Sequence, residues 1–312
     1  MKTSESYLPE GSYAALPAVR QAFESVDGLR RAQDEGMILE AVTQRCTAAH
    51  DLLFDFGFAQ GIMPRSCCAL GVAEGDTREI AILSRVGKPT CFVITELDES
   101  TAPPTVWLSR TIAQQRAQDH LLASLRPGDV IPARVTHLEP FGAFVDIGCG
   151  VASLIGIENL SVSRIFHPHD RLRVGQHIYA AVRAVDRDAR RISLTHRELL
   201  GTWEQNAALF SPGETVRGVV RSVEPYGVFI ELAPNLSGLA EPRGDLSAGT
   251  VVSVYIKSIL PQRMKIKLTV IDVLACREPP PPPRYFITDG HISQWVYTPD
   301  CCDRKYIATE FE

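Results

Sequence analysis

The sequence contains one stretch twice, as PGDVIPARVTHLEPFGAFVD at 127–146 and as PGETVRGVVRSVEPYGVFIE at 212–231. The two copies align without a gap at an offset of 85 residues, and seven of the twenty positions are identical. These positions are Pro127/Pro212, Gly128/Gly213, Val135/Val220, Glu139/Glu224, Pro140/Pro225, Gly142/Gly227 and Phe144/Phe229. Because repetition at a fixed register defines a structural module, the chain has at least two copies of one module.

Each copy has the pattern of a β-hairpin. In the first copy, apolar and polar residues alternate over 131–136, a Pro-aromatic-Gly turn follows, and a second strand runs over 143–147. The turn has an aromatic residue at its apex and another three residues later, which are Phe141 and Phe144 in the first copy and Tyr226 and Phe229 in the second. Two rings with this spacing can share one face of a sheet.

The similarity continues beyond the hairpin. Leu154 matches Leu239 at the same offset, and the register resumes at an offset of 74 from Gly175/Gly249 to Thr195/Thr269. About five short strands in a module of this length indicate a small barrel, with the five-stranded OB-fold as the leading candidate. The eleven extra residues of the first copy fall between its third and fourth strands.

The runs GDVIPARVTHLEPFGAFVDIG and GQHIYAAVRAVDRDARRISLT resemble the RNA-binding repeat of the ribosomal protein S1 family. From the first module to about Ile271, the chain is similar to the short bacterial form of that family. The usual His after Gly-Leu-Val is Gly156 or Glu241 here, and the usual Asp is Asp186 or Leu260. The resemblance implies an all-β fold of three tandem five-stranded OB-fold barrels with helical linkers and a small β-hairpin tail.

We therefore expect six segments along the chain. They are an N-terminal helical cap at 1–35, a degenerate barrel with its linker helix at 36–125, an RNA-binding barrel at 126–197, a linker helix at 198–211, a second RNA-binding barrel at 212–272, and a Pro-rich spacer with a β-hairpin tail at 273–312. The five prolines at 279–283 favour an extended spacer. The Asp289-Gly290 pair predicts the turn of the tail hairpin, and RKYIA at 304–308 could add a third strand.

The region before the repeats has its own expected elements. The patterns predict a helix over 17–33, in which Gly28 is unfavourable, and a helix over 111–125 that Pro127 ends. The predicted strands of the degenerate barrel are MILEAVTQ, LLFDFGF, GIMPR, REIAILS, TCFVITEL and TVWLS. Phe54, Phe56 and Phe58 are expected in its core.

The first module is expected to contact protein instead of RNA. Alignment of Asp55 with Asp146 places His50 and Leu53 where the repeats have their rings, and residues 1–125 carry 16 acidic and 11 basic residues. Excess negative charge repels phosphates. The alternative, that this module only stabilises the next barrel through the 111–125 helix, stays open.

The aromatic pairs predict base stacking on single-stranded RNA. The basic excess lies in the repeats, with 10 basic and 7 acidic residues over 126–197 and 7 and 6 over 212–272. The remaining candidate RNA contacts are Arg134, Arg183, Asp186, Arg191 and His196 in the first copy and Arg221, Lys257, Lys265 and Lys267 in the second. Alternatively, one ring of each pair belongs to the core and about half of the cations serve solubility.

No catalytic site, metal site or cofactor is expected. The chain lacks the Gly-Lys-Ser/Thr, His-Glu-x-x-His and Gly-x-Ser-x-Gly motifs, and the histidines of the 166–170 loop lack a second ligand cluster. Eight cysteines without Cys-x-x-Cys spacing, and no signal peptide or membrane span, favour the cytoplasm.

The sequence thus predicts a protein that binds single-stranded RNA, and the family resemblance implies mRNA as the ligand and the small ribosomal subunit as a partner. Two alternatives stay open. The barrels could serve a regulator of RNA decay or transcription away from the ribosome, or they could dock proteins with their rings buried.

Overall fold

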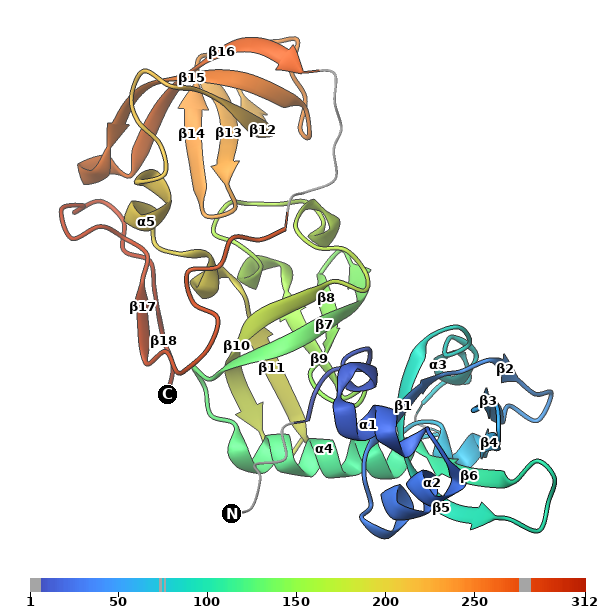
Figure 1. Ribbon diagram of the computed structural model, residues 1–312. Helices are drawn as coiled ribbons and strands as arrows, with labels where there is room; N and C mark the ends of the chain where they lie inside the picture. Colours follow the sequence, from blue (N-terminus) through green and yellow to red (C-terminus); the bar gives the residue numbers. More distant parts are fainter. Residues whose placement is uncertain (1–6, 73–74, 76, 275–281) are drawn as a thin grey trace. The chain divides into compact units, whose positions relative to one another are not determined.

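A computed structural model describes residues 7–72, 75, 77–274 and 282–312 (Figure 1). These residues divide into two compact units. One unit comprises the chain up to Ser124 together with 132–134 and 146–152, and the other comprises 125–131, 135–145 and 153–312. Among the described residues, the longest and most apolar helices still fall short of what crossing a membrane requires.

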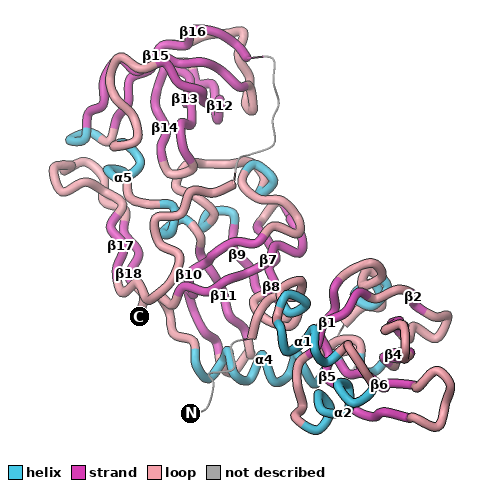
Figure 2. Tube along the Cα trace, in the orientation of Figure 1, coloured by secondary structure: helices cyan, strands magenta, loops and turns pink. Residues whose placement is uncertain are grey.

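Two closed five-stranded barrels confirm the fold expected for the repeats (Figure 2). The second barrel consists of β7 (Val130–Glu139), β8 (Gly142–Asp146), β9 (Ala152–Gly156), β10 (His177–Asp186) and β11 (Arg191–Thr195), in the order β10-β11-β9-β8-β7. The third consists of β12 (Thr215–Glu224), β13 (Gly227–Ala233), β14 (Leu236–Ala240), β15 (Val251–Leu260) and β16 (Lys265–Leu274), in the order β12-β13-β14-β16-β15.

The first strand of each repeat closes its barrel because it pairs with two neighbours. In the third barrel, residues 215–219 of β12 pair with β15, and residues 219–224 pair with β13. Period-two alternation determines which side chains face the core. Val228 and Ile230 are fully buried, whereas Phe229 between them is half-buried. The apolar interior and the outward ring therefore come from the same strand.

The first module is a six-stranded sheet curled into a half-barrel, which is consistent with the OB-fold expected for it, although this sheet is not closed as the two repeats are. Its strands are β1 (Leu39–Val42), β2 (Arg45–Cys46), β3 (Leu52–Asp55), β4 (Gln60–Met63), β5 (Pro89–Asp98) and β6 (Thr105–Ser109), in the order β1-β5-β6-β4-β3-β2. Thr43 N donates to Lys88 O at 3.1 Å, and Gln44 N donates to Leu53 O at 2.9 Å. The first strand therefore changes partner between Thr43 and Gln44, which divides it into the two edge strands.

The prediction of a strand at REIAILS is wrong, because these residues form the short helix α3 (Ile80–Leu83). Leu83 N donates to Glu79 O and Ser84 N to Ile80 O, both at 3.0 Å. A short apolar run does not separate strand from helix by its period alone. Of the three phenylalanines expected in the core, Phe54 is 1% exposed, whereas Phe56 and Phe58 are half-buried. Phe56 packs against Phe23 with 5.0 Å between ring centroids.

The N-terminal helix is divided into α1 (Pro17–Ala22) and α2 (Val26–Asp34), after the 3-10 turn η1 (Tyr13–Ala15). Ser25 caps α2 by accepting a hydrogen bond from Gly28 N at 3.1 Å. A Cβ atom at residue 28 would lie 2.6 Å from the carbonyl oxygen of Ala22. The close approach of the two helices therefore requires glycine at this position.

The predicted linker helices are present in different lengths. The 111–125 helix is α4 (Arg110–Ser124), whereas the second linker is the 3-10 turn η5 (Arg197–Leu200) followed by α5 (Trp203–Ala207). In α5, Thr202 and Gln205 form a reciprocal capping box. The remaining 3-10 turns are η2 (Arg65–Cys67), η3 (Ile157–Asn159), η4 (Pro168–Asp170) and η6 (Pro261–Arg263).

The tail contains a hairpin, but the turn predicted at Asp289-Gly290 is wrong. The paired strands are β17 (Gln294–Val296) and β18 (Ala308–Glu310). The backbone around Gly290 bonds to the second barrel instead, because Gly290 O accepts from Val130 N at 3.0 Å and Ile292 N donates to Gly128 O at 2.9 Å. Of the predicted proline spacer, residues 279–281 lie outside the described residues.

Candidate nucleic-acid interface

The two barrels present aromatic pairs with the same geometry. Phe141 and Phe144 have ring centroids 5.9 Å apart and planes at 88°, and Tyr226 and Phe229 have centroids 6.1 Å apart and planes at 88°. Phe141 is 55% exposed and Tyr226 is 65% exposed, whereas the second ring of each pair is half-buried. Each barrel therefore offers one exposed ring, which packs at right angles against a half-buried second ring.

A glycine after the open ring lets the turn lie directly on the third strand of its barrel. A Cβ atom on Gly142 would lie 2.4 Å from Ile155 O, and one on Gly227 would lie 2.6 Å from Ala240 O. Both approaches are far shorter than any real Cβ contact, so a side chain there would push the turn away. The Pro-aromatic-Gly pattern thus fixes where the ring stands.

In the third barrel, a cation lies on the same outward face as the ring pair. Phe229 pairs with Leu239 on β14, and Leu239 pairs with Lys267 on β16. Val228 and Ile266 are buried, and they directly precede Phe229 and Lys267 in their strands. Because neighbouring side chains of a strand point to opposite faces, Phe229 and Lys267 point outward. A strand that stacks on the rings can therefore place a phosphate near Lys267.

The hairpin between the last two strands carries the basic residues that fill the family position, Arg191 and Lys265. Both are exposed. Arg191 lies directly opposite Asp186, and Lys265 opposite Leu260. The carboxylate of Asp186 accepts a hydrogen bond from Ala189 N at 2.8 Å, so it stabilises the turn of this hairpin.

The equivalent cations Arg183 and Lys257 each have a nearby carboxylate. Lys257 Nζ lies 2.9 Å from Glu241 Oε1, and Arg183 Nη1 lies 3.9 Å from Glu158 Oε1. The hydrogen bond from Lys257 holds the pKa of Glu241 below its usual value. Exposed pairs of this kind are weak, so RNA phosphates can compete for the cations.

Three predicted RNA contacts point elsewhere, and the structure corrects them. Arg134 is half-buried and donates to Glu10 O at 2.9 Å. The side chain of Arg221 is 11% exposed and lies 2.8 Å from Glu231 Oε2. His196 is fully buried and hydrogen-bonds Leu160 O and the Tyr285 hydroxyl, both at 3.0 Å.

The buried His196 is a neutral structural residue. Burial lowers its pKa to about 4, because charging the imidazole away from water is unfavourable. The Tyr285 hydroxyl belongs to the tail. The sequence did not predict that the tail contacts His196, which directly follows β11. Strand alternation indicates which side chains point outward from a barrel, but it does not indicate which of these side chains another segment of the chain covers.

A second cluster of ionisable groups lies in the first compact unit and is also structural. Arg110 Nε lies 2.7 Å from Glu10 Oε1, and Arg85 Nη2 lies 2.9 Å from Glu10 Oε2. Asp146 accepts from Glu10 N at 2.7 Å, and burial together with the Glu10 charge raises its pKa to about 7. Glu10 and Asp146 are at most 4% exposed, so this carboxylate pair is closed to a substrate.

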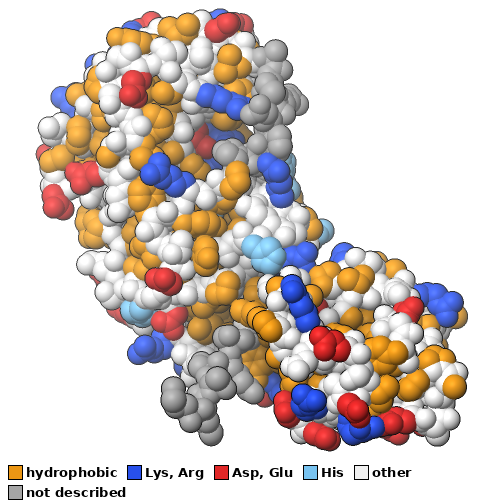
Figure 3. Space-filling view, in the orientation of Figure 1, with side chains coloured by type: hydrophobic (Ala, Val, Ile, Leu, Met, Phe, Trp, Pro, Cys, Tyr) orange, Lys and Arg blue, Asp and Glu red, His pale blue; other side chains and the backbone are white. Residues whose placement is uncertain are grey.

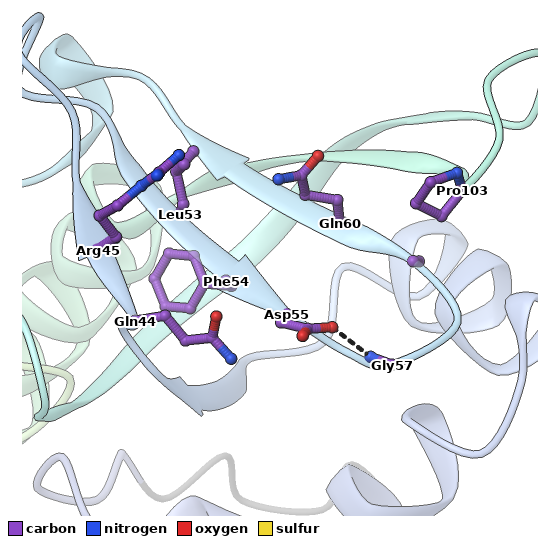
Figure 4. Close-up of a pocket in the computed structure, with 9 residues that line it drawn as sticks. Gln44, Arg45, Leu53, Phe54, Asp55, Gly57, Gln60 and Pro103 are labelled. Carbon is purple, nitrogen blue, oxygen red and sulfur yellow. Dashed lines mark hydrogen bonds between the residues drawn. The ribbon is translucent and has the colours of Figure 1, made fainter.

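The first module offers a pocket without an open ring. The pocket has a volume of about 530 Å³ and is lined by residues from β2, β3, β4 and the adjoining turns (Figure 4). Its aromatic residue, Phe54, is 1% exposed, and the Asp55 carboxylate accepts from Gly57 N at 2.7 Å. Within the described part of the chain, no group of three or more His, Cys, Asp or Glu is arranged to hold a metal ion.

The family model described as S1 RNA binding domain matches residues 124–197. Small ribosomal subunit protein bS1 of Staphylococcus haemolyticus is 31% identical over 276 residues, which cover 83% of this chain and 68% of that protein. The bS1 homolog of Bacillus subtilis is 31% identical over 233 residues, covering 70% and 59%. A solved multidomain protein with nucleic acid binding domains from Streptococcus pneumoniae is 13% identical with a TM-score of 0.25, covering 76% of this chain and 74% of that one.

The closed barrels, their repeated ring pairs and the matched domain define a protein of tandem S1 RNA-binding domains. The chain belongs to the small ribosomal subunit protein bS1 family. This family membership and the S1 RNA-binding domain show that the chain binds RNA in translation.

Proposed function

We propose that the second and third barrels each bind single-stranded mRNA by stacking bases on Phe141 and Tyr226. The observation that supports this most is the repetition of one ring geometry, with an exposed apex ring in both barrels. Base stacking on an aromatic ring contributes roughly 1–3 kcal/mol per base and tolerates any base. The proposed ligand is therefore unpaired RNA of mixed sequence.

Phosphate contacts supplement the stacking. The exposed cations that remain after the corrections above are Arg183, Arg191, Lys257, Lys265 and Lys267. On the face drawn in Figure 3, basic and acidic side chains are interspersed, so the electrostatic attraction there is modest. We propose that the rings supply much of the affinity, and that the protein binds RNA in the cytoplasm without chemical change to it.

For the first module we propose contact with a protein of the small ribosomal subunit. An apolar patch supports this: Ile80 is 63% exposed, Leu83 is 44% exposed and Val86 is 42% exposed. The buried Ile82 anchors α3, so Ile80 and Leu83 on the same helix are held in place at the surface, and Val86 lies three residues after Leu83. Ordered apolar side chains gathered on a surface are typical of protein contacts.

Two measurements on the full-length protein test the proposal. Purified protein should bind a labelled unstructured RNA, and the same RNA annealed to its complement should compete poorly, because a duplex hides the base faces. In a density gradient of cell extract, the protein should travel with small ribosomal subunits. Preference for duplex, or RNA turnover that survives repurification, contradicts RNA binding as proposed, and separation from the subunits favours a regulator away from the ribosome.

A further inference from the structure

A groove lies between the second and third barrels, whose facing residues belong to the same compact unit. Its volume is about 920 Å³, which falls within the range of roughly 300–1,000 Å³ found for ligand pockets. One wall is the loop after η3, with Phe166, His167 and His169, and the other walls include Arg217 on β12 and Arg284 after the spacer. None of the ring pairs lines this groove.

Ion pairs and backbone hydrogen bonds fix the loop on the third barrel. Arg171 contacts Glu231 on β13, and the side chains of both residues are at most 7% exposed. Arg221 joins the same carboxylate to Asp170, with Nη1 of Arg221 3.5 Å from Asp170 Oδ1. Ser163 N also donates to Pro234 O at 3.1 Å. The groove is therefore preformed, with its charged floor already paired.

The rim of the groove has the chemistry that recognises a nucleotide. Phe166 is 63% exposed, and Arg217 and Arg284 are exposed guanidinium groups. The lining residues include four arginines against the two carboxylates Asp170 and Glu231, in a chain whose formal net charge is −5. The Arg284 guanidinium lies 5.6 Å from the centroid of the Phe286 ring, which supports its position.

We propose that this groove is a further RNA subsite, which holds the strand as it passes from the second barrel to the third. A base stacks on Phe166, and backbone phosphates contact Arg217 and Arg284. The inference rests on the proposed binding of RNA by the two ring pairs. An open aromatic ring beside guanidinium groups, flanked by two RNA-binding barrels, favours a polynucleotide over an acidic peptide.

The test compares two RNA lengths on the full-length protein. An oligonucleotide of about 5 nucleotides is near the lower limit of one OB-fold site, whereas one of about 20 nucleotides can span both barrels. Phe166→Ala should weaken binding of the longer RNA about tenfold and leave the shorter RNA unchanged. The double variant Arg217→Ala/Arg284→Ala should do the same and make the log-log salt slope shallower by about 1.4.

Matched controls lie in the tail, outside the groove. Tyr306 is 70% exposed and Arg304 is exposed, so Tyr306→Ala and Arg304→Ala remove the same chemistry elsewhere and should leave both RNAs unaffected. If the groove variants leave the longer RNA unchanged, or weaken both lengths equally, the subsite is wrong. If Phe141→Ala and Tyr226→Ala also have no effect, RNA binding on the ring pairs fails as well, and the two failures are thus distinguished.

Discussion

The ring of Tyr226 stands at right angles to the ring of Phe229, with 6.1 Å between the centroids and 88° between the planes. Edge-to-face pairs of this kind are favourable, and here the tyrosine ring stays 65% exposed. The half-buried phenylalanine orients the exposed ring before any base arrives. The barrel therefore loses little side-chain freedom when a base stacks on it.

The first prediction concerns the open rings. Phe141→Ala and Tyr226→Ala should each weaken binding of unstructured RNA by roughly 1–3 kcal/mol, measured by fluorescence anisotropy, with the melting temperature almost unchanged. Val228→Ala provides the contrast, because Val228 is fully buried and its truncation should lower the melting temperature. A ring variant that mainly lowers the melting temperature would mark that ring as structural.

The second prediction concerns salt. The slope of log affinity against log salt concentration should be shallow, about −2 to −4, because the five exposed cations near the rings account for about −3.5 at about −0.7 per phosphate. Lys265→Gln/Lys267→Gln should reduce that magnitude by about 1.4. A much steeper slope in the unmodified protein would show that the cations, and not the rings, dominate the affinity.

The third prediction concerns His196. Its pKa is lowered from 6.5 to about 4 in the folded state, so the unfolded chain binds more protons between these values, and stability falls as the pH drops from 6.5 through 4. His196→Asn keeps a donor for Leu160 O but does not titrate. The difference in unfolding free energy between the two proteins should therefore change by about 3 kcal/mol across this window.

Urea denaturation at several pH values measures this difference. Other groups that titrate at a similar pH, such as Asp146, contribute equally to the unfolding free energies of both proteins, so their contributions cancel in the difference. A difference that stays constant between pH 4 and 6.5 would show that His196 is not held neutral by burial.

The fourth prediction concerns Asn235 of the third barrel, which is fully buried. It contacts the loop after η3 and the linker that begins with η5. Its amide donates to Arg197 O at 2.7 Å and Gly201 O at 2.8 Å, and its oxygen accepts from Val162 N at 2.9 Å. Asn235→Ala leaves these buried groups unpaired and should lower the unfolding free energy by about 2–5 kcal/mol. Gln262→Ala, at an exposed position, should have little effect on the same denaturation curve.

The fifth prediction concerns the apolar patch of the first module. Ile80→Ser/Leu83→Ser should reduce co-sedimentation with small ribosomal subunits, because a partner gains less from burying polar than apolar side chains. RNA affinity should stay unchanged. Ile271→Ser is a matched control, since Ile271 is 56% exposed in the third barrel. Unchanged sedimentation of the double variant would remove this patch from the interface.

The sequence was sufficient for the features that short-range patterns encode. The offset repeat predicted both closed barrels, and the Pro-aromatic-Gly turns predicted where Phe141 and Tyr226 stand. Features set by distant partners were not predictable. Arg221 is covered because the long loop folds onto the third barrel and brings Asp170 within 3.5 Å of its guanidinium, and Gly290 bonds to Val130 instead of closing a hairpin. The strand alternation at Ile80 and Ile82 did not reveal a helix because both periods fit so short a run.

Because the tail follows both barrels in the chain, the junction between these barrels is completed only after both have been synthesised. Trp295 and Tyr297 belong to the same buried cluster as Leu199 and Trp203, and the Tyr297 hydroxyl donates to Asn235 O at 2.6 Å. Synthesis runs from the N-terminus, so both barrels leave the ribosome before the residues that complete their junction. A nascent chain that stops before residue 285 leaves this apolar surface open and is a ready substrate for proteases. Synthesis through Tyr297 is therefore a condition for lasting stability of the two barrels.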